Sequence, residues 1–563
     1  EAQPAEQERL AERGPPEVVT SCNGGEVYID EEPCKSHLQS VLDMVIDRLP
    51  PLKLLALKEA VRNYSVRFGG LVTRASACTG CDIKAKVDGL LNAFYFTHFD
   101  SRVDSVHCLR SEINIKKPLF IRQMFNDATF IVGDMKGLQQ DMVRDCISGT
   151  DRVAPHFVSF DVGFPCKSRT PLSAKCRENL NCCQKDTAET GKAVNCIFKI
   201  VEKNWPEEVL MECVVNLMQV GEGCLISDAA WITQQLSERG YWCIDTVVQA
   251  LKQGSPVPRE RIYWAAVRGI PKEKYVEASH FFLDILHAFN VGEMTPAQCN
   301  EVFLIKKTQL REGISDSCGL PVYAGTGLMS NQSKGPKASE PNYKTDHHQI
   351  FTASGFEWPV NWDGPRGADV PPDGLYARER ESLAFLHWRF PFDVANGAEY
   401  AEFIEINTSL PRLLQGCVEP DSEYERFKKS PWRPTPGTLI GSGKIAVRYA
   451  YDGAIVVRLL EPVEYLRCIG WGSSFCEMQL FSQSAMHALN PPLTQASYAD
   501  LIADMAGNAW SAYSYAAVRT ALIATSGKYV PAQVVDLSSV DAADDVGASE
   551  DATKAGVDPE GDG

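Results

Sequence analysis

The sequence predicts an α/β protein built on an open, mainly parallel sheet. From about residue 70 to residue 275, short apolar segments typical of strands alternate with amphipathic segments typical of helices. This alternation is typical of a parallel sheet that is covered by helices on both faces. Gly, Pro, Ser and Asn then become frequent over 315–348, and a helical pattern returns over 490–527. The sequence therefore predicts a sheet domain with a second, irregular domain inserted into it.

Composition narrows the class of protein. The chain has 563 residues, 19 Cys and a formal net charge of −17. An odd number of Cys in a long chain favours reduced thiols in an intracellular protein. The acidic balance counts against a general nucleic-acid-coating protein, so a DNA-binding surface is expected to be a local basic face. No apolar run reaches the roughly 18–20 residues that a membrane-spanning helix needs, and the polar opening is typical of neither a signal peptide nor a transit peptide.

The expected elements follow in chain order. A helical pair broken by Pro50-Pro51 spans 36–64, because apolar residues recur at helical spacing on both sides of the prolines. A helix is expected from Ser227 or Asp228, which cap its start, to Gly240, which ends it. The segments expected to be strands are 129–135, 156–164, 208–217 and 242–251. The predicted divisions of the chain are 1–65 (helical extension), 66–275 (sheet domain), 276–455 (inserted domain), 456–530 (return to the sheet domain) and 531–563 (acidic disordered tail).

One cysteine follows a predicted strand on a rigid turn. The apolar segment 157–162 stops at Gly163, and Phe164-Pro165 then leads to Cys166. Most single cysteines are inert buried thiols. A thiol at the carboxyl end of a parallel strand, however, lies in the crevice where open α/β sheets bind ligands. The position therefore favours a functional thiol.

Three further stretches accompany this turn. "MECV" holds Glu212 at the end of a buried strand, "GSPVPRERIYWAAVRG" holds Arg259 and Arg261 on one side of an extended segment, and "DMAGNAW" holds Gly507-Asn508. In this order, the four stretches resemble the DNA (cytosine-5)-methyltransferase family, over about residues 70–275 and 455–525. The resemblance implies a Rossmann-like, S-adenosylmethionine-dependent methyltransferase sheet with an inserted target-recognition domain. It also implies an enzyme that methylates C5 of cytosine in double-stranded DNA.

The resemblance assigns roles around a flipped-out cytosine. Cys166 is the nucleophile that adds to C6 and makes C5 reactive toward a methyl group. Glu212 holds the base at N3 and N4, Arg261 contacts its O2, and Arg259 orders the Cys166 loop. The basic residues expected to favour the ionised thiol are Lys167 and Arg169.

The resemblance also places the methyl donor, S-adenosylmethionine. Glu112 follows the second strand, where an acidic residue bonds the ribose hydroxyls, and Asp134 follows the third, where it meets the adenine amino group. Asn508 closes the site from the last helices. The full set of expected donor-binding residues is Cys78, Thr79, Gly80, Glu112, Ile113, Asp134, Met135, Gly163 and Asn508.

DNA contacts are expected chiefly in the inserted domain, where basic residues lie among Gly-Pro turns beside Trp432. The expected DNA-binding residues are Lys167, Arg412, Lys428, Lys429 and Arg433. A nuclear, monomeric protein follows from the same resemblance.

No metal site is expected. The Cys78-Cys81 pair has no second pair at zinc spacing, and the His347-His348 pair, in a polar loop, is expected to be exposed. A further group of thiols also lacks a matching histidine pattern: Cys176, Cys182, Cys183 and Cys196.

The sequence departs from the family pattern at four places. Cys213 replaces an Asn, Val257 and Lys167 each replace a Gln, and Asp82 stands where a glycine is usual. These departures leave two alternatives open. One is a catalytically impaired homologue that acts as a DNA-binding or regulatory protein, and the other is an RNA cytosine-5 methyltransferase on the same fold.

Overall fold

The structure of the protein is a computed structural model. The residues that it describes are 19–20, 26–27, 37–78, 80–114, 116–125, 130–170, 176–303, 383, 386, 390, 392, 401–406, 430–439, 444–451, 454–460, 462–471 and 495–531.

A seven-stranded sheet forms the centre of the protein, with the strand order β10-β11-β9-β8-β3-β4-β5. The strands are β3 (Leu71–Ala77), β4 (Asp104–Ser111), β5 (Phe130–Val132), β8 (Ser159–Gly163), β9 (Glu208–Cys213), β10 (Tyr241–Gln249) and β11 (Glu260–Arg268). Neighbouring strands from β5 to β9 are parallel, whereas β11 is antiparallel to both β9 and β10. The chain begins in the middle at β3, moves outward to β5, and returns to β8 on the other side of β3. The predicted Rossmann-like α/β fold is therefore confirmed, and its switch point lies between β3 and β8.

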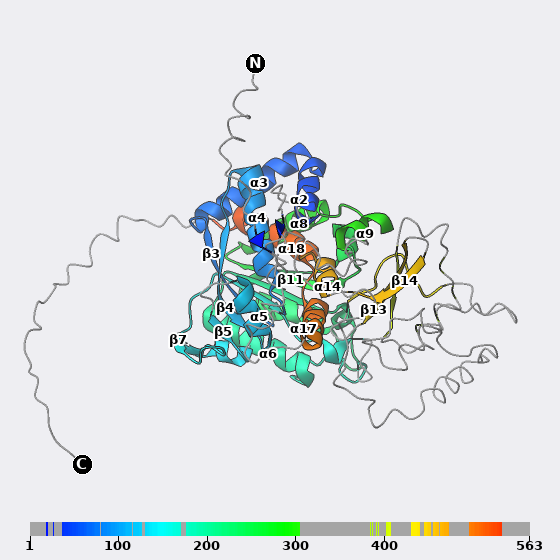
Figure 1. The fold of residues 1–563 in the computed structure, drawn as a ribbon. Helices are drawn as coiled ribbons and strands as arrows, with labels where there is room; N and C mark the ends of the chain where they lie inside the picture. Colours follow the sequence, from blue (N-terminus) through cyan, green and yellow to red (C-terminus); the bar gives the residue numbers. More distant parts are fainter. Residues whose placement is uncertain are drawn as a thin grey trace, which may run out of the picture.

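Helices cover both faces of this sheet (Figure 1). On β9, Leu210 joins one hydrophobic core while Val209 and Met211 join the other, as expected for side chains that alternate between faces. The helices of the first face are α2 (His37–Arg48), α3 (Pro51–Arg67), α4 (Ile83–Phe99), α8 (Tyr275–Ala288) and α18 (Ala512–Tyr529). The helices of the second face are α6 (Ala188–Asn204) and α7 (Asp228–Glu238). Two covered faces explain why the strand segments are nearly continuously apolar.

The predicted helices over 36–64 and from Ser227 or Asp228 to Gly240 are confirmed, and Tyr241–Cys243, which the helical pattern also covered, begin β10. Pro51 is the first residue of α3, where its missing N–H costs nothing. Ser227 caps α7, with its Oγ accepting a 3.2 Å hydrogen bond from the Ala230 N–H. Gly240 follows the helix with a φ of +82°, a left-handed conformation that favours glycine.

The last helix, α18, packs against α3, α4 and α8, and it is anchored to the sheet by buried charges. Arg519 forms ion pairs with Asp161 on β8 and with Glu208 on β9, and all three side chains are fully buried. Tyr515 donates toward Asp161 Oδ2 at 3.0 Å and Asp88 Oδ1 at 3.1 Å. The C-terminal helix thus belongs to the sheet domain, as the return of a helical pattern predicts.

A second, smaller sheet occupies part of the predicted insertion. It is antiparallel and contains β12 (Glu402–Glu405), β13 (Ile445–Tyr451) and β14 (Ala454–Leu459). Arg448 on β13 pairs with Glu402 at 2.6 Å and lies 4.2 Å above the Trp432 ring. The predicted domain boundaries stay predictions, although α8 begins at the expected end of the sheet domain and packs on α18.

The remaining elements are short or lie at the edges. They are β1 (Val19–Thr20), β2 (Glu26–Val27), α5 (Lys116–Phe125), η1 (Met135–Gln139), β6 (Met142–Arg144), β7 (Asp151–Val153), η2 (Lys167–Arg169), η3 (Val215–Met218), η4 (Ala250–Gln253), η5 (Lys272–Lys274), α9 (Pro296–Phe303), α14 (Pro462–Cys468) and α17 (Gln495–Asn508). Within the described part of the chain, no helix is long and apolar enough to cross a membrane.

Candidate active site

The loop after β3 turns sharply toward the end of β4. Cys78 and Gly80 have φ values of +51° and +62°, so the backbone doubles back over a short distance. The Gly80 N–H donates to Glu112 Oε2 at 3.1 Å, and the Asn114 N–H lies 3.3 Å from Oε1. The Glu112 carboxylate is buried and lies beside the first loop, as the predicted donor site requires. Thr79 lies outside the described residues.

Asp82, which stands where the family has a glycine, has a structural partner. Its carboxylate is fully buried and lies 2.5 Å from Nε of Arg110 on β4. Its own φ is +55°, a conformation that Asp tolerates better than most residues. The ion pair therefore holds the turn in the left-handed shape that a glycine would adopt freely.

Cys166 and Glu212 come from neighbouring strands. Gly163, the last residue of β8, pairs with Glu212 in the parallel register of β9, and Cys166 follows three residues after Gly163. The Pro165 carbonyl accepts a 2.8 Å hydrogen bond from the Thr190 hydroxyl, which fixes the turn before the thiol. Cys166 is half-buried. The structure thus brings the expected nucleophile and the expected base-holding carboxylate to one edge of the sheet.

Cys213 also contacts the nucleophile turn. Its thiol lies 3.9 Å from the Phe164 carbonyl oxygen, in the geometry of a weak S–H hydrogen bond. A weak donor therefore stands where the family has an Asn. Val257, by contrast, is packed into the hydrophobic core and offers no side-chain hydrogen bond in place of the family's Gln.

Two arginines on β11 and its approach enclose Glu212. Arg261 Nε lies 2.9 Å from Glu212 Oε1, and the Glu212 side chain is only 7% exposed. Arg259 is buried, and its Nη1 donates to the Gly507 carbonyl at 3.1 Å. Burial and the neighbouring Arg261 lower the pKa of Arg259 to about 10. Arg259 therefore joins the start of β11 to the end of α17.

Burial raises the pKa of the Cys166 thiol, and Glu212 adds to this, while Arg261 and Arg259 oppose it. The cations that act on this thiol thus come from β11 and from the residue just before it. The expectation that Arg169 supplies this charge is wrong, because its buried guanidinium donates to the carbonyls of Asn216 and Cys176. Lys167 lies in η2, and its side chain is outside the described residues.

The alkylation rate of Cys166 should therefore rise with pH, with a midpoint above the ordinary thiol value of about 8.5. The substitution Arg261→Gln should move this midpoint higher, because it removes a cation and leaves Glu212 unpaired. Mass spectrometry of the Cys166 peptide after iodoacetamide pulses measures both. The control is Arg268→Gln, at the far end of β11, which should leave the midpoint unchanged. A midpoint below the ordinary value would contradict this account.

The segment between α17 and α18 packs against the Gly80 loop after β3 and against Gly163 at the end of β8. A Cβ at Gly80 would lie 3.5 Å from Ala509 Cα, so the two backbones are in van der Waals contact. The Asn508 side chain turns away instead: its Nδ2 donates to the carbonyl and the carboxylate of Asp504, and the residue is exposed. The backbone of 508–509, rather than the Asn508 amide, is what meets the first loop.

Trp510 is a site residue that motif comparison missed. Its indole is buried, and its Nε1 has no hydrogen-bond partner in the described part of the protein. A Cβ at Gly163 would lie 2.3 Å from this Nε1 and 3.3 Å from Glu212 Oε2. The indole N–H is therefore held at the end of β8, close to the Glu212 carboxylate. The available signal was its place two residues after Asn508.

Because this contact leaves no room for a methyl group, Gly163→Ala should cost about 1–3 kcal/mol of stability. Combining it with Trp510→Phe should recover part of the loss, since the smaller ring lacks Nε1. Urea unfolding measures both. Gly89→Ala is the matched control, because nothing lies within 4 Å of a Cβ at Gly89 in α4. That variant should be neutral or up to about 1 kcal/mol more stable; equal losses at the two glycines would contradict the account.

Three expected donor-binding residues lie apart from this close group. Asp134 is exposed, and its carboxylate caps η1 by accepting the Lys136 N–H at 2.9 Å. Ile113 is 77% exposed, and Met135 is half-buried in η1. Their expected roles stay predictions.

The structure describes few of the expected DNA-binding residues. Arg412, Lys428 and Lys429 lie outside the described residues. Arg433 is exposed, and its backbone pairs with Phe403 on β12. Its side chain is thus free to face solvent beside the small sheet.

The protein is similar to known proteins in its structure and not in its sequence. No family model and no curated protein matches the sequence. The Dnmt2 methyltransferase of S. pombe is similar over 80% of this chain and 98% of its own, with 11% identity and a TM-score of 0.35. A prophage-encoded E. coli protein described as a DNA modification methyltransferase is similar over 80% and 98%, with 14% identity and a TM-score of 0.34. At these values, a function for this chain has to be argued from the geometry of its own site.

Proposed function

We propose that this protein is a methyltransferase that uses S-adenosylmethionine to methylate C5 of cytosine in DNA. The observation that carries the proposal is the convergence of Cys166, Glu212 and Arg261 at the carboxyl edge of the sheet, where α/β folds bind ligands. A thiol, a carboxylate and a guanidinium are the groups that addition to a pyrimidine ring requires. Double-stranded DNA as partner and a nuclear location belong to the same proposal.

Each side chain then has a defined task. The Cys166 thiolate forms a bond to C6 of an extruded cytosine, which gives C5 the electron density to attack a methyl group. Glu212 holds the N3 and N4 edge, and the adjacent Arg261 reaches O2 and balances the carboxylate. In the free protein, burial raises the pKa of the Cys166 thiol although Arg261 and Arg259 already oppose it, so further stabilisation of the thiolate has to come from the bound base and donor.

The residues present fit a methyl donor. The buried Glu112 carboxylate accepts a hydrogen bond from the Gly80 N–H, and the backbone of 508–509 packs against Gly80. The orphaned Trp510 Nε1 is a buried donor that an acceptor atom of a ligand would satisfy. Cys78 lies in the same loop and would contact the ligand. When bound, S-adenosylmethionine supplies an electrophilic methyl group; this chain contributes the surfaces that position and desolvate it.

Duplex DNA that contains 5-fluorocytosine provides the sharpest test. After methylation, the enzyme is normally released when the proton at C5 is removed. Fluorine cannot be removed in this way, so a covalent complex should accumulate on denaturing gels only when S-adenosylmethionine is present. The same experiment with RNA separates the RNA alternative. If neither substrate forms an adduct while DNA binding is retained, the protein is an impaired homologue and the proposal is wrong.

The substitution Glu212→Gln tests the role of the Glu212 carboxylate in the same experiment. The amide keeps the size of the side chain but cannot balance Arg261, so adduct formation should slow at least about 100-fold. Glu238→Gln, on the exposed end of α7, is the matched control and should leave the rate unchanged.

A further inference from the structure

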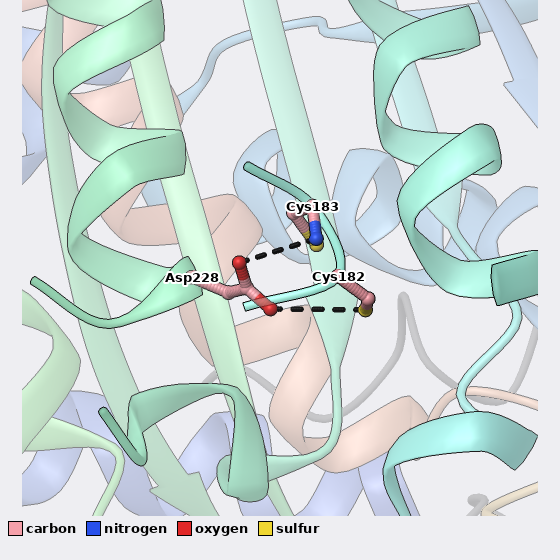
Figure 2. A group of neighbouring side chains, drawn as sticks. All are labelled: Cys182, Cys183 and Asp228. Carbon is pink, nitrogen blue, oxygen red and sulfur yellow. Dashed lines mark hydrogen bonds between the residues drawn. The ribbon is translucent and has the colours of Figure 1, made fainter. Parts of the chain in front are cut away.

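A second group of reactive side chains lies behind the nucleophile turn. Cys182 and Cys183 belong to the turn before α6, and Asp228 is the first residue of α7. All three side chains are buried, and their two sulfur atoms and a carboxylate oxygen lie within 4.8 Å of one another. Figure 2 shows the Asp228 carboxylate between α7 and the turn, facing both cysteines. None of these residues has a task in the proposed reaction.

The spacing suits a metal ion. Cys182 Sγ lies 3.7 Å from Asp228 Oδ2 (Figure 2). In a tetrahedral zinc site with bonds of about 2.3 Å to sulfur and about 2.0 Å to oxygen, such ligand atoms are roughly 3.5 Å apart. An ion could therefore enter with only a small movement of the ligands.

The carboxylate is already oriented for this purpose. Asp228 Oδ1 accepts the backbone N–H groups of Cys183 at 3.2 Å and Gln184 at 3.3 Å. These bonds occupy one oxygen and direct the other toward the Cys182 sulfur, as outer hydrogen bonds do for metal ligands. Within the described residues, no Lys, Arg or His forms an ion pair with Asp228, whose carboxylate is held by hydrogen bonds, while the buried Arg169 guanidinium acts on the neighbouring Cys182.

The two thiols belong to adjacent residues of one turn, and both are buried. A divalent cation would replace both thiol protons and neutralise most of the resulting negative charge.

The geometry points to one new metal site: we propose that Cys182, Cys183 and Asp228 bind a single Zn²⁺ ion, with water as the fourth ligand. Two S–H bonds are broken, two Zn–S bonds form, and two protons pass to solvent. Zinc rather than calcium or magnesium fits, because two of the three protein ligands are sulfur.

The site would brace the nucleophile turn without entering the reaction. Asn179, in the same turn as the cysteines, donates to the Ser168 carbonyl at 3.2 Å. On the other side, a Cβ at Gly191 in α6 would lie 2.1 Å from the Cys182 carbonyl oxygen, so the turn is clamped against that helix. An ion here would join the turn to α7, and it would raise stability by binding only the folded chain.

Metal loading of the full chain tests the proposal. Reduced, chelator-treated protein should bind one equivalent of Zn²⁺ that the double variant Cys182→Ser/Cys183→Ser lacks, with two protons released. With Co²⁺ as the probe, the native chain should show a thiolate-to-cobalt charge-transfer band. Cys196→Ser is the matched control, since that buried thiol bonds Gln139 and lies outside the trio, and it should keep the equivalent.

A further variant guards against misfolding of the double variant. Asp228→Asn keeps an oxygen for the two backbone N–H groups but removes the charge, so zinc affinity should fall at least about tenfold with circular dichroism unchanged. The proposal is overturned if native protein shows no thiolate band with Co²⁺. It is equally overturned if the double variant binds as much Zn²⁺ as the native chain.

Discussion

Cys166→Ala is expected to lower methyl transfer to DNA by at least about 10⁴-fold. The Cys166 thiol is the group that forms the bond to C6. Glu212 and the arginines hold the base but cannot add to it, and the neighbouring Cys213 thiol is buried against the Phe164 carbonyl. Loss of a nucleophile removes the chemical step rather than binding, so the fall should appear in kcat and not in donor or DNA affinity. Transfer of a tritiated methyl group to duplex DNA measures the rate.

Two control variants test whether the loss of activity is specific to Cys166. Cys224→Ala removes another half-buried thiol, from the loop between β9 and α7, and should leave the rate within about twofold of the native value. Cys213→Ala removes only the weak bond to the Phe164 carbonyl and should have an intermediate effect. Transfer that survives Cys166→Ala within tenfold of the native rate would end the proposal that this residue is the nucleophile.

Arg519→Met should destabilise the protein by about 3–5 kcal/mol, the typical cost of removing one partner from a buried ion pair. Arg519 Nη1 lies 3.3 Å from Glu208 Oε2 and 3.1 Å from the Ser159 hydroxyl, and the guanidinium also pairs with Asp161. Methionine fills similar space but leaves two carboxylates buried beside it without that cation. The urea midpoint for unfolding measures the loss.

The surrounding network decides how large this loss is. Tyr64 also donates to Glu208 Oε2, at 3.1 Å, and Arg74 lies 4.0 Å from the same oxygen, so Glu208 keeps some support. Adding Asp161→Asn and Glu208→Gln to the methionine variant should therefore restore part of the stability, because the uncompensated charges are removed.

Lys528→Met, at the exposed end of the same helix, is the matched control. It gives up a cation–π contact with Phe281 at 3.9 Å and should cost about 1 kcal/mol or less. A loss below about 1 kcal/mol for Arg519→Met would mean that the buried charges do not anchor α18. Because Trp510 lies just before this helix and Gly507 lies in the last turn of the preceding α17, the anchorage of α18 also helps to keep both at the site.

The sequence by itself determined the order and type of most elements that position the site. Apolar periodicity and helix caps act over a few residues, so the helical pair before β3, the α7 helix and the strands that hold Gly163 and Glu212 can be predicted from local sequence. The predicted strand over 208–217 is too long, because β9 ends at Cys213 and η3 follows. It also placed Cys166, Glu212 and Glu112 at one edge, because parallel strands all end there.

Only the tertiary structure decided which charges and donors meet. Arg169 follows Cys166 closely in sequence but turns away to Asn216, whereas Arg261 arrives from a distant strand. The Asp228 carboxylate likewise reaches Cys182 from another helix, and Trp510 reaches Gly163 from the far end of the chain. The physical reason is the range of the forces involved: local pattern sets an element and its buried face, but the partner of a buried polar group is set by packing between elements that sequence distance does not encode.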